Sequence, residues 1–473
     1  MRHDMRPDDG LCTQLAALTL ATAHGPLGAE AVEAARRLVQ HAFGVAAVSS
    51  ALPVSAIARA AAGDARGPCL IFGSAASHAS QDAAFANGAT GHASLLEDSG
   101  PGGTACGSHP ATYVFPAALA AAQERDASGM ALLRAVCAAY ETVDRLGGLM
   151  PAEVTQRGFR AVSVLGPFGA AAAAGVLYGL TVAQLAAAYG IAANLAGGLN
   201  QGFLDGTMEP YLHPAFAGRN GLLAARLAQA GCTASPQSLE GARGFFATFG
   251  GRVPEGFAGP LGTDGTAGDS RPLAVCRVGA KHYATCLYNQ GTLALVKRRF
   301  PAGLAAADIA RVTLSRPASG MHGLAAPGVA ALPAPGNALQ LQMSARFTCA
   351  AALLGRPVGS ADWFETAMHD AEVCALARAI ELVTHAAPGI RIDVALRDGR
   401  REVAEAGAET ALVFSSAHID AAFTERVRPL LGDNTAEAGA LLNELPRLES
   451  LEHLASLFKI DNAPSHDNPA RAA

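Results

Sequence analysis

The sequence predicts a mainly helical protein in which one large all-helical domain is interrupted by a smaller α+β lid domain. Apolar residues recur at three- and four-residue spacing over most of the first 230 residues, as they do on one face of a helix. Two later stretches, 309–317 and 389–403, instead alternate like strands. Because helical spacing then returns, we expect a discontinuous helical domain over residues 1–265 and 404–473, and the lid domain over residues 266–403.

The first domain is expected to consist of closely packed helices. Half of the residues are apolar and only 5% are aromatic, and several helical segments are apolar nearly all round, which is typical of helices buried inside a domain. Small residues, mainly Ala and Gly, let such helices approach closely. The segments predicted to be helical are residues 29–48, 80–96, 129–147 and 182–199.

The second domain follows a change in composition. Residues 251–272 are rich in Gly and Pro and predict a linker or a long surface loop. The two strand-like stretches enclose two predicted helices, 343–355 and 361–382, and this order is expected of a small α+β domain. The helices expected after it are residues 415–432, 435–448 and 450–459, followed by a disordered tail over residues 463–473.

Charge, apolar runs and cysteines exclude several classes of protein. The 35 basic and 40 acidic residues nearly balance, so nothing indicates a nucleic-acid or membrane partner. The apolar run 166–180 is too short and too rich in Ala and Gly to span a bilayer, and the polar N-terminus does not resemble a signal peptide. Nine scattered cysteines without a CxxC pair indicate reduced thiols and a cytoplasmic protein.

Four stretches, in order along the chain, match the sequence signatures of one enzyme family. They are FANGATGHASLLEDSG…GSHPATYVFPAALAAA (85–122), RGFRAVSVLGPFGAAAAAGVLYGL (157–180), MEPYLHPAFAGRNGLLAARLAQAGCTASPQSLEGARGFF (208–246) and VGAKHYATCLYNQGTLALV (278–296). QMSARFTCAAALLGRPVG (342–359) matches a further family helix. On these motifs the chain resembles the MmgE/PrpD family, which includes 2-methylcitrate dehydratase, cis-aconitate decarboxylase and iminodisuccinate epimerase.

The resemblance implies a helical domain, an α+β lid, an active site between them, and a homodimer. It also implies cofactor-independent chemistry at a carbon next to a carboxylate. His109, His213 and Lys281 match the family's motifs. The departures from the family pattern are Leu95 at the first acid of the acidic motif, Ser99 at its threonine, Arg160 and Gln290 at two histidines, and Pro210 at a lysine.

His109 and Lys281 are the expected catalytic residues. His109 follows a Gly-rich loop and precedes a helix that begins near Pro110. Amides at a helix N-terminus tend to keep an imidazole neutral, which suits a general base. Lys281 is expected to neutralise a substrate carboxylate or to donate a proton. The alternatives are a histidine that braces the loop and an ordinary surface lysine at the edge of the lid.

Arg160 and Asp98 are expected to bind the substrate. Arginine is a poor base but grips carboxylates with a planar fork, so Arg160 would turn an acid/base position into a binding position. Its alternative is a surface arginine in a drifted loop. Glu97 and Asp98 are expected to pair with Arg160 or to cap the following helix, the alternative being a solvated charged face.

Ser99, His213 and Tyr283 complete the expected substrate-binding set. The Ser99 hydroxyl would bond a substrate oxygen, unless it is an ordinary loop or cap serine. His213 precedes Pro214 in an expected inter-helix turn and shapes the pocket. Tyr283 stands where the family usually has an aromatic residue, so packing is its favoured role.

The residues point to an enzyme without a metal or other cofactor. The histidines lack HxH or HExxH spacing, and the Gly-rich segments lack the context of a phosphate loop. The leading hypothesis is a lyase or isomerase acting on a small carboxylate by proton transfer, dehydration, decarboxylation or epimerisation. The missing acid, histidine and lysine argue against standard 2-methylcitrate or cis-aconitate chemistry. The alternative is a catalytically altered or inactive member that binds a ligand or partner.

Overall fold

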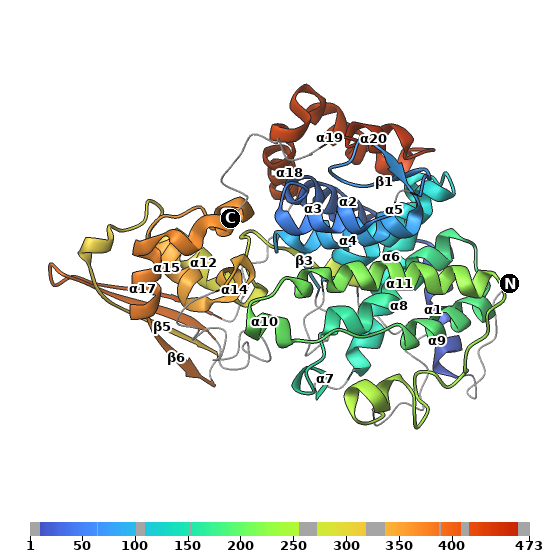
Figure 1. The fold of residues 1–473 in the computed structure, drawn as a ribbon, viewed down its shortest axis with the longest axis horizontal. Helices are drawn as coiled ribbons and strands as arrows, with labels where there is room; N and C mark the ends of the chain where they lie inside the picture. The colour runs from blue at the N-terminus through green and yellow to red at the C-terminus, as the bar shows by residue number, and fades with distance from the viewer. Residues whose placement is uncertain are drawn as a thin grey trace.

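The computed structural model describes residues 10–63, 65–100, 109–150, 153–254, 272–317, 336–386, 389–407 and 416–461. It contains a large helical part with an α+β part attached at one end (Figure 1). The chain enters the α+β part after α11 and returns to the helical part with α18, which packs against α2. The predicted fold class, a helical domain plus a smaller α+β domain, is therefore confirmed.

The helical part includes both the first helices of the chain and the last. Its helices are α1 (Leu11–His24), α2 (Ala29–Ser49), α3 (Pro53–Ala61), α4 (Ser80–Ala93), α5 (Ala111–Glu124), α6 (Gly129–Leu149), α7 (Glu153–Gln156), α8 (Ala161–Leu177), α9 (Val182–Asn194), α10 (Gln201–Asp205), α11 (Glu209–Gln229), α18 (Ser416–Leu431), α19 (Thr435–Asn443) and α20 (Glu452–Leu457). Strands β1 (Cys69–Leu70) and β2 (Ser77–His78) pair antiparallel beside them.

Helix α8 is the centre of this part and packs against α5, α6, α9 and α11. Glycines set its closest approach to α11. A Cβ on Gly221 would lie 2.4 Å from the carbonyl oxygen of Pro167, and one on Gly166 would lie 2.6 Å from Cβ of Ala217. The small residues of the sequence therefore let these two buried helices touch backbone to backbone, as their composition predicts.

The α+β part consists of one four-stranded sheet and the helices packed on it. The strand order is β6-β5-β7-β8, with β6 parallel to β5 and the other pairs antiparallel. Its elements are β5 (Ile309–Pro317), β6 (Glu381–His385), β7 (Ile390–Leu396), β8 (Arg401–Ala406), α12 (Leu287–Arg299), α14 (Ala338–Met343), α15 (Ala345–Leu353), α16 (Ala361–Thr366) and α17 (Ala371–Ala379).

Two predictions for this part are wrong in detail. The predicted strand over 389–403 is a hairpin, β7 and β8, in which Gly399 takes the positive φ (+89°) that such a reversal requires. The predicted helix over 361–382 is split, because Asp370 accepts a hydrogen bond from the amide of Val373 and begins α17 there. Strand β6 then follows directly and was not predicted.

Other predicted elements are shortened, or lie partly outside the described residues. The predicted helix over 80–96 ends at Ala93, since Leu95 has a φ of +53°. The predicted helix over 182–199 ends at Asn194, and Gly198 follows with a φ of +134°. The predicted linker 251–272 is described only at residues 251–254 and 272, and the predicted tail 463–473 lies outside the described residues. The predicted domain boundary at 403/404 falls inside β8.

The contacts that join the two parts include a two-residue antiparallel pairing and side-chain hydrogen bonds. Strand β3 (Asp98–Ser99), from the helical part, pairs with β4 (Gly279–Ala280) at the start of the α+β part. Nearby, the hydroxyl of Tyr211 donates to Oε1 of Gln342 on α14, at 2.7 Å. These contacts fix the loop after α4 against the segment that contains Lys281.

Among the described residues, no single helix is long and apolar enough to cross a membrane. Helices α2 and α3 meet the length and composition requirements only together, and the chain bends by 95° between them.

Candidate active site

Glu97 and Lys281 form a buried ion pair where the two parts of the chain meet. Each side chain is only 1% exposed, and the ammonium of Lys281 donates to Oε1 of Glu97. The pairing of β3 with β4 brings them together, and the amide of Lys281 also lies 3.3 Å from the carbonyl oxygen of Glu97. The alternative of a surface lysine is therefore wrong, as is that of a solvated acidic face.

The Glu97 carboxylate is ionised despite its burial. Burial alone raises the pKa of a carboxyl group. The charge of Lys281 outweighs this and holds the pKa of Glu97 well below its usual range. Nδ1 of His92 lies 3.3 Å from Oε1 of Glu97, and Nδ1 of His109 lies 3.6 Å from it. One carboxylate oxygen thus faces three nitrogen atoms.

His109 is held in one neutral tautomer. Its Nδ1 lies 2.9 Å from the carbonyl oxygen of Asp98. Because a carbonyl oxygen only accepts hydrogen bonds, Nδ1 must carry the hydrogen, which leaves Nε2 with a free lone pair. Burial first, and then the charge of Lys281, hold the pKa of His109 well below its usual range. Nε2 is therefore an unprotonated proton acceptor at neutral pH.

His92 is a site residue that was not among the sequence-based candidates, and Ser163 is another. Its Nε2 lies 2.7 Å from Nη2 of Arg160. A guanidinium only donates, so Nε2 accepts and Nδ1 carries the hydrogen that faces Glu97. Burial is the main reason that the pKa of His92 falls to about 4, so the ring is neutral. His92 stands five residues before Glu97 within the first family-like stretch, which is the only sequence signal that could have identified it.

Arg160 is buried, with only 8% of its surface exposed, and its guanidinium is held by a carbonyl oxygen that lacks its usual partner within α11. Pro214 lies inside α11 and has no N–H to bond the carbonyl oxygen of Pro210, four residues earlier. Nη1 of Arg160 donates to that oxygen instead, at 2.6 Å, and the guanidinium lies 4.8 Å from the ring centre of Phe203. Burial lowers the pKa of Arg160 to about 10, so it remains charged at neutral pH. The alternative of a surface arginine is wrong.

His213 lies inside α11 and not in the turn predicted for it, because α11 continues through Pro214. It faces Ser163 across Gly198, whose added Cβ would lie 2.3 Å from Oγ of Ser163 and 3.4 Å from Cδ2 of His213. Burial, then the charge of Arg160, lower the pKa of His213 to about 3.

Several buried polar atoms around these residues have no hydrogen-bond partner within the described part of the chain. They are Oε2 of Glu97, Oγ of Ser99, Oγ of Ser163 and Nδ1 of His213. An unpaired buried polar atom is costly, and native proteins usually satisfy such atoms with a ligand or an ordered water. Together they form a set of donors and acceptors that is available to a polar ligand.

Both carboxyl oxygens of Asp98 accept hydrogen bonds from other residues of the protein. Its Oδ1 accepts from the amide of Ala111 at 3.0 Å and its Oδ2 from the hydroxyl of Tyr140 at 2.7 Å. Asp98 therefore caps α5, as one of the sequence-based interpretations proposed, and it does not pair with Arg160. Burial raises its pKa to about 7.

Tyr283 packs beside His282, with 5.0 Å between ring centres. No described contact links it to the Glu97 cluster, which consists of Glu97, Lys281, His92, His109, Arg160 and His213. The side chain of Gln290, which replaces a family histidine, instead holds the loop before α12. Its Oε1 accepts from the amides of His282 and Tyr283, and its Nε2 donates to the carbonyl oxygen of Tyr283 at 2.9 Å.

The cluster carries a net positive charge at neutral pH. Lys281 and Arg160 are cations, Glu97 is the anion facing them, and the three histidines are neutral. Asp98, with its pKa of about 7, is about half ionised and reduces this surplus without cancelling it. Such a buried surplus favours an anionic ligand. Within the described residues no group of three or more His, Cys, Asp or Glu side chains is arranged to hold a metal ion.

Comparison with known proteins matches both parts of the chain to one protein family. The MmgE/PrpD N-terminal domain matches residues 13–256, and the MmgE/PrpD C-terminal domain matches residues 283–411. The cis-aconitate decarboxylase-like protein oryM of Aspergillus oryzae is 30% identical over 266 residues, which is 53% of this chain and 54% of that protein. The match thus spans about half the length of this curated relative.

Proposed function

Because this chain belongs to the MmgE/PrpD family, we propose that it is a cofactor-independent lyase or isomerase that moves a proton on a small carboxylate-bearing metabolite. Family membership supports a lyase-type enzyme in general terms. The observation that carries the more specific proposal is the tautomer of His109. Because Nδ1 carries the hydrogen, Nε2 keeps an unshared lone pair, and a general base requires such a proton acceptor.

The proposed first step is removal of a proton from the carbon next to a substrate carboxylate. The C–H electron pair moves into the adjoining carboxylate as an enolate, and the proton goes to Nε2 of His109. The charge of Lys281 and Arg160 favours this developing negative charge in a buried setting. Return of the proton to a different carbon of the enolate system completes an isomerisation, and its return to the opposite face of the same carbon completes an epimerisation. Departure of a leaving group from the neighbouring carbon instead completes an elimination.

We propose roles for the other residues from the polar atoms that they leave without a hydrogen-bond partner among the described residues. Ser99 and His213 keep unpaired buried polar atoms, which supports a role in binding substrate oxygens, and Ser163 joins them. Arg160 is proposed to bind or polarise the substrate while it orients His92. Asp98 is proposed to position His109 and α5. Substrate binding by Tyr283 and the homodimer stay predictions.

The departures at Leu95, Arg160 and Pro210 lead us to propose a reaction other than the standard 2-methylcitrate or cis-aconitate one. Leu95 is 2% exposed and packs in the apolar core, so it brings no polar group to the cluster. The guanidinium of Arg160 is a poor proton acceptor, whereas His109 alone can both remove and return a proton. A single-base proton transfer therefore requires the fewest groups.

The test is incubation of the purified protein in deuterated water with a panel of mono-, di- and tricarboxylates, followed by mass spectrometry and NMR. Deuterium incorporation without other mass change is the expected result for an isomerase, and loss of water or carbon dioxide for a lyase. Absence of both on every acid, while an acid still protects the protein from thermal unfolding, would favour the inactive ligand-binding alternative. Absence of protection as well would contradict a carboxylate ligand.

A further inference from the structure

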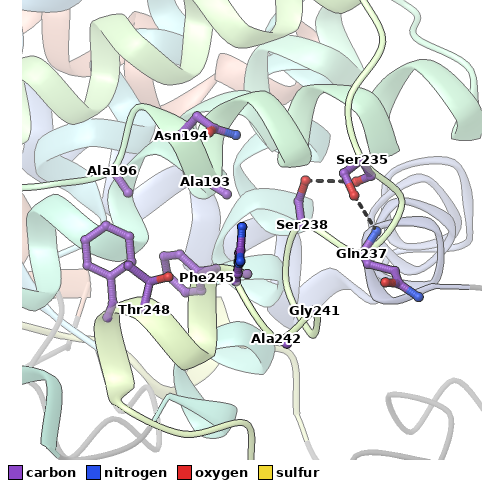
Figure 2. A pocket seen from close by; sticks show the side chains of 13 residues that line it. Ala193, Asn194, Ala196, Ser235, Gln237, Ser238, Gly241, Ala242, Phe245 and Thr248 are labelled. Atoms are coloured by element: carbon purple, nitrogen blue, oxygen red, sulfur yellow. Dashed lines mark hydrogen bonds between the residues drawn. The ribbon is translucent and has the colours of Figure 1, made fainter.

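A hollow opens on the helical part, away from the Glu97 cluster. It has a volume of about 500 Å³ and lies between the end of α9 and the segment 235–249 (Figure 2). None of the residues that line it belongs to the Glu97 cluster. Its volume falls within the range of about 300–1,000 Å³ typical of small-molecule sites.

Small residues keep this hollow open. Ala193 and Ala196 form one wall, and Gly241, Ala242 and Gly244 form part of the rim, so short residues border much of the space. The two walls are fixed against each other nearby. A Cβ on Gly190 of α9 would lie 2.5 Å from Cβ of Ala234, at the base of the facing segment.

The lining combines an apolar floor with polar sides and a cation. The buried ring of Phe245 packs on that of Phe249, with 5.2 Å between ring centres. Ser238 donates to the carbonyl oxygen of Ser235 at 2.8 Å, which holds the polar side in shape (Figure 2). Arg243 also lines the hollow, and its exposed guanidinium has no hydrogen bond or ion pair with any described residue.

This chemistry fits one class of ligand. A guanidinium binds a carboxylate with two parallel hydrogen bonds, and aromatic rings bury the flat faces of apolar groups. A small carboxylic acid with a flat, apolar body would satisfy Arg243 and cover Phe245 and Phe249 at the same time.

Both walls of the hollow continue into the backbone that holds Arg160. The ring of Phe249 packs against Phe159, the residue before Arg160, with 5.0 Å between ring centres. On the other wall, two residues beyond Ala196, the carbonyl oxygen of Gly198 accepts from the amide of Arg160 at 3.1 Å. A ligand that immobilised the two walls would therefore restrict residues 158–163.

We propose that this hollow is a second ligand site, for a small carboxylic acid with a flat apolar body, and that its occupation stiffens the backbone around Arg160. The probe is 4-fluorobenzoate, and its binding is followed by the broadening of its ¹⁹F NMR line. Its neutral counterpart, 4-fluorobenzamide, tests the need for the carboxylate. The wild type is expected to broaden the acid at least tenfold more strongly than the amide, the ratio expected for one charge-assisted contact.

Three variants locate the probe. Ala193→Phe fills the hollow and is expected to abolish the broadening. If Ala193→Phe does not fold, Ala242→Trp, at the exposed rim, replaces it and is expected to abolish the broadening too. Arg243→Gln is expected to weaken binding about tenfold. Arg66→Gln, an exposed arginine outside the hollow, is the matched control and is expected to bind like the wild type. Retained binding in the filled variants would overturn the proposal and would place the acid elsewhere, for example at the Glu97 cluster.

Hydrogen exchange tests the second half of the proposal. Saturating 4-fluorobenzoate is expected to slow amide exchange in peptides that cover residues 158–163 in the wild type, and to leave the same peptides unchanged in Ala193→Phe. Binding without slowed exchange there would contradict the link to Arg160.

Discussion

His109 donates its Nδ1 hydrogen to the carbonyl oxygen of Asp98 across 2.9 Å, while the Asp98 carboxylate is itself held by Tyr140 and by the start of α5. The orientation of the proposed base is therefore set by backbone, not by another flexible side chain. Because the acceptor is a carbonyl oxygen, the free nitrogen of His109 is necessarily Nε2. The proton-transfer proposal depends on this geometry.

The tautomers can be measured directly. Long-range ¹H–¹⁵N correlation spectra of protein labelled at histidine are expected to show His92 and His109 as neutral Nδ1–H tautomers at pH 7, because Arg160 and Asp98 dictate where each hydrogen sits. Arg160→Gln removes the guanidinium that donates to His92 and to the carbonyl oxygen of Pro210 but leaves the carbonyl oxygen of Asp98 in place, so the tautomer of His109 is expected to persist. An Nε2–H tautomer or an imidazolium at His109 would contradict the assignment.

The buried pair of Glu97 and Lys281 is expected to show strong energetic coupling. Glu97→Gln leaves the ammonium of Lys281 without its counter-charge and is expected to lower the free energy of unfolding by about 3–5 kcal/mol. Lys281→Met is expected to cost a similar amount, and the double variant much less than the sum, as measured by urea unfolding.

The matched control for that cycle is an exposed pair of the same signs. Glu381→Gln breaks the contact between Arg311 and Glu381 on the sheet, where both side chains face solvent. It is expected to change the unfolding free energy little. Additive effects of the two buried substitutions would show that Glu97 and Lys281 do not depend on each other.

Stability is expected to fall as the pH decreases from about 6.5 toward 4. Burial lowers the pKa of His41 and of His213 to about 3 and that of His92 to about 4. Below pH 6.5 these histidines bind protons in the unfolded chain but stay neutral in the folded protein. The free energy of unfolding therefore falls by about 2 kcal/mol for each histidine by pH 5. Asp98 acts in the opposite direction, because its pKa is raised to about 7 and the folded protein binds this proton more readily than the unfolded chain does. Its protonation adds to the free energy of unfolding by an amount similar to the loss from one histidine. Urea midpoints that are equal or higher at pH 5 than at pH 7.5 would contradict this balance.

Gly198 is expected to tolerate no side chain. Its φ of +134° is unfavourable for other residues, and a Cβ would lie 2.3 Å from Oγ of Ser163. Gly198→Ala is therefore expected to destabilise the protein by about 1–3 kcal/mol. The control is Gly148→Ala near the end of α6, where an added Cβ meets nothing within 4 Å and about 0.5–1 kcal/mol of stabilisation is expected. Equal unfolding midpoints for Gly198→Ala and the wild type would refute the tight contact.

Periodic spacing was sufficient to predict the helical part, and alternation was sufficient to predict that strands follow it. Helices α2 and α6 match their predicted limits within two residues, because long amphipathic or apolar segments carry the clearest pattern. The alternating pattern predicts one strand where the structure has the hairpin of β7 and β8, because Asp398 and Gly399 fall within an otherwise alternating stretch. Where helix stops and strand β6 begins depends on pairing with β5, which local sequence does not encode.

Residues of the site could be predicted only where they lie in a family-like sequence motif. His109 and Lys281 were found through the family-like stretches, but the partner of Lys281 was not, since Glu97 is 184 residues away in sequence and meets it through β3 and β4. The setting of Arg160 likewise depends on a carbonyl group that Pro214 leaves free in another helix. Such pairings follow from tertiary packing and not from local spacing.

The central claim is that His109 moves a proton on a carboxylate substrate, and the most direct measurement is the rate of solvent deuterium incorporation by His109→Asn relative to the wild type. The acid used is one that the wild type exchanges, and unchanged thermal unfolding of the variant shows that it remains folded. Loss of the general base predicts a fall of about 10²–10⁴-fold. A rate within a few-fold of the wild type would contradict the account and assign the proton transfer to another group.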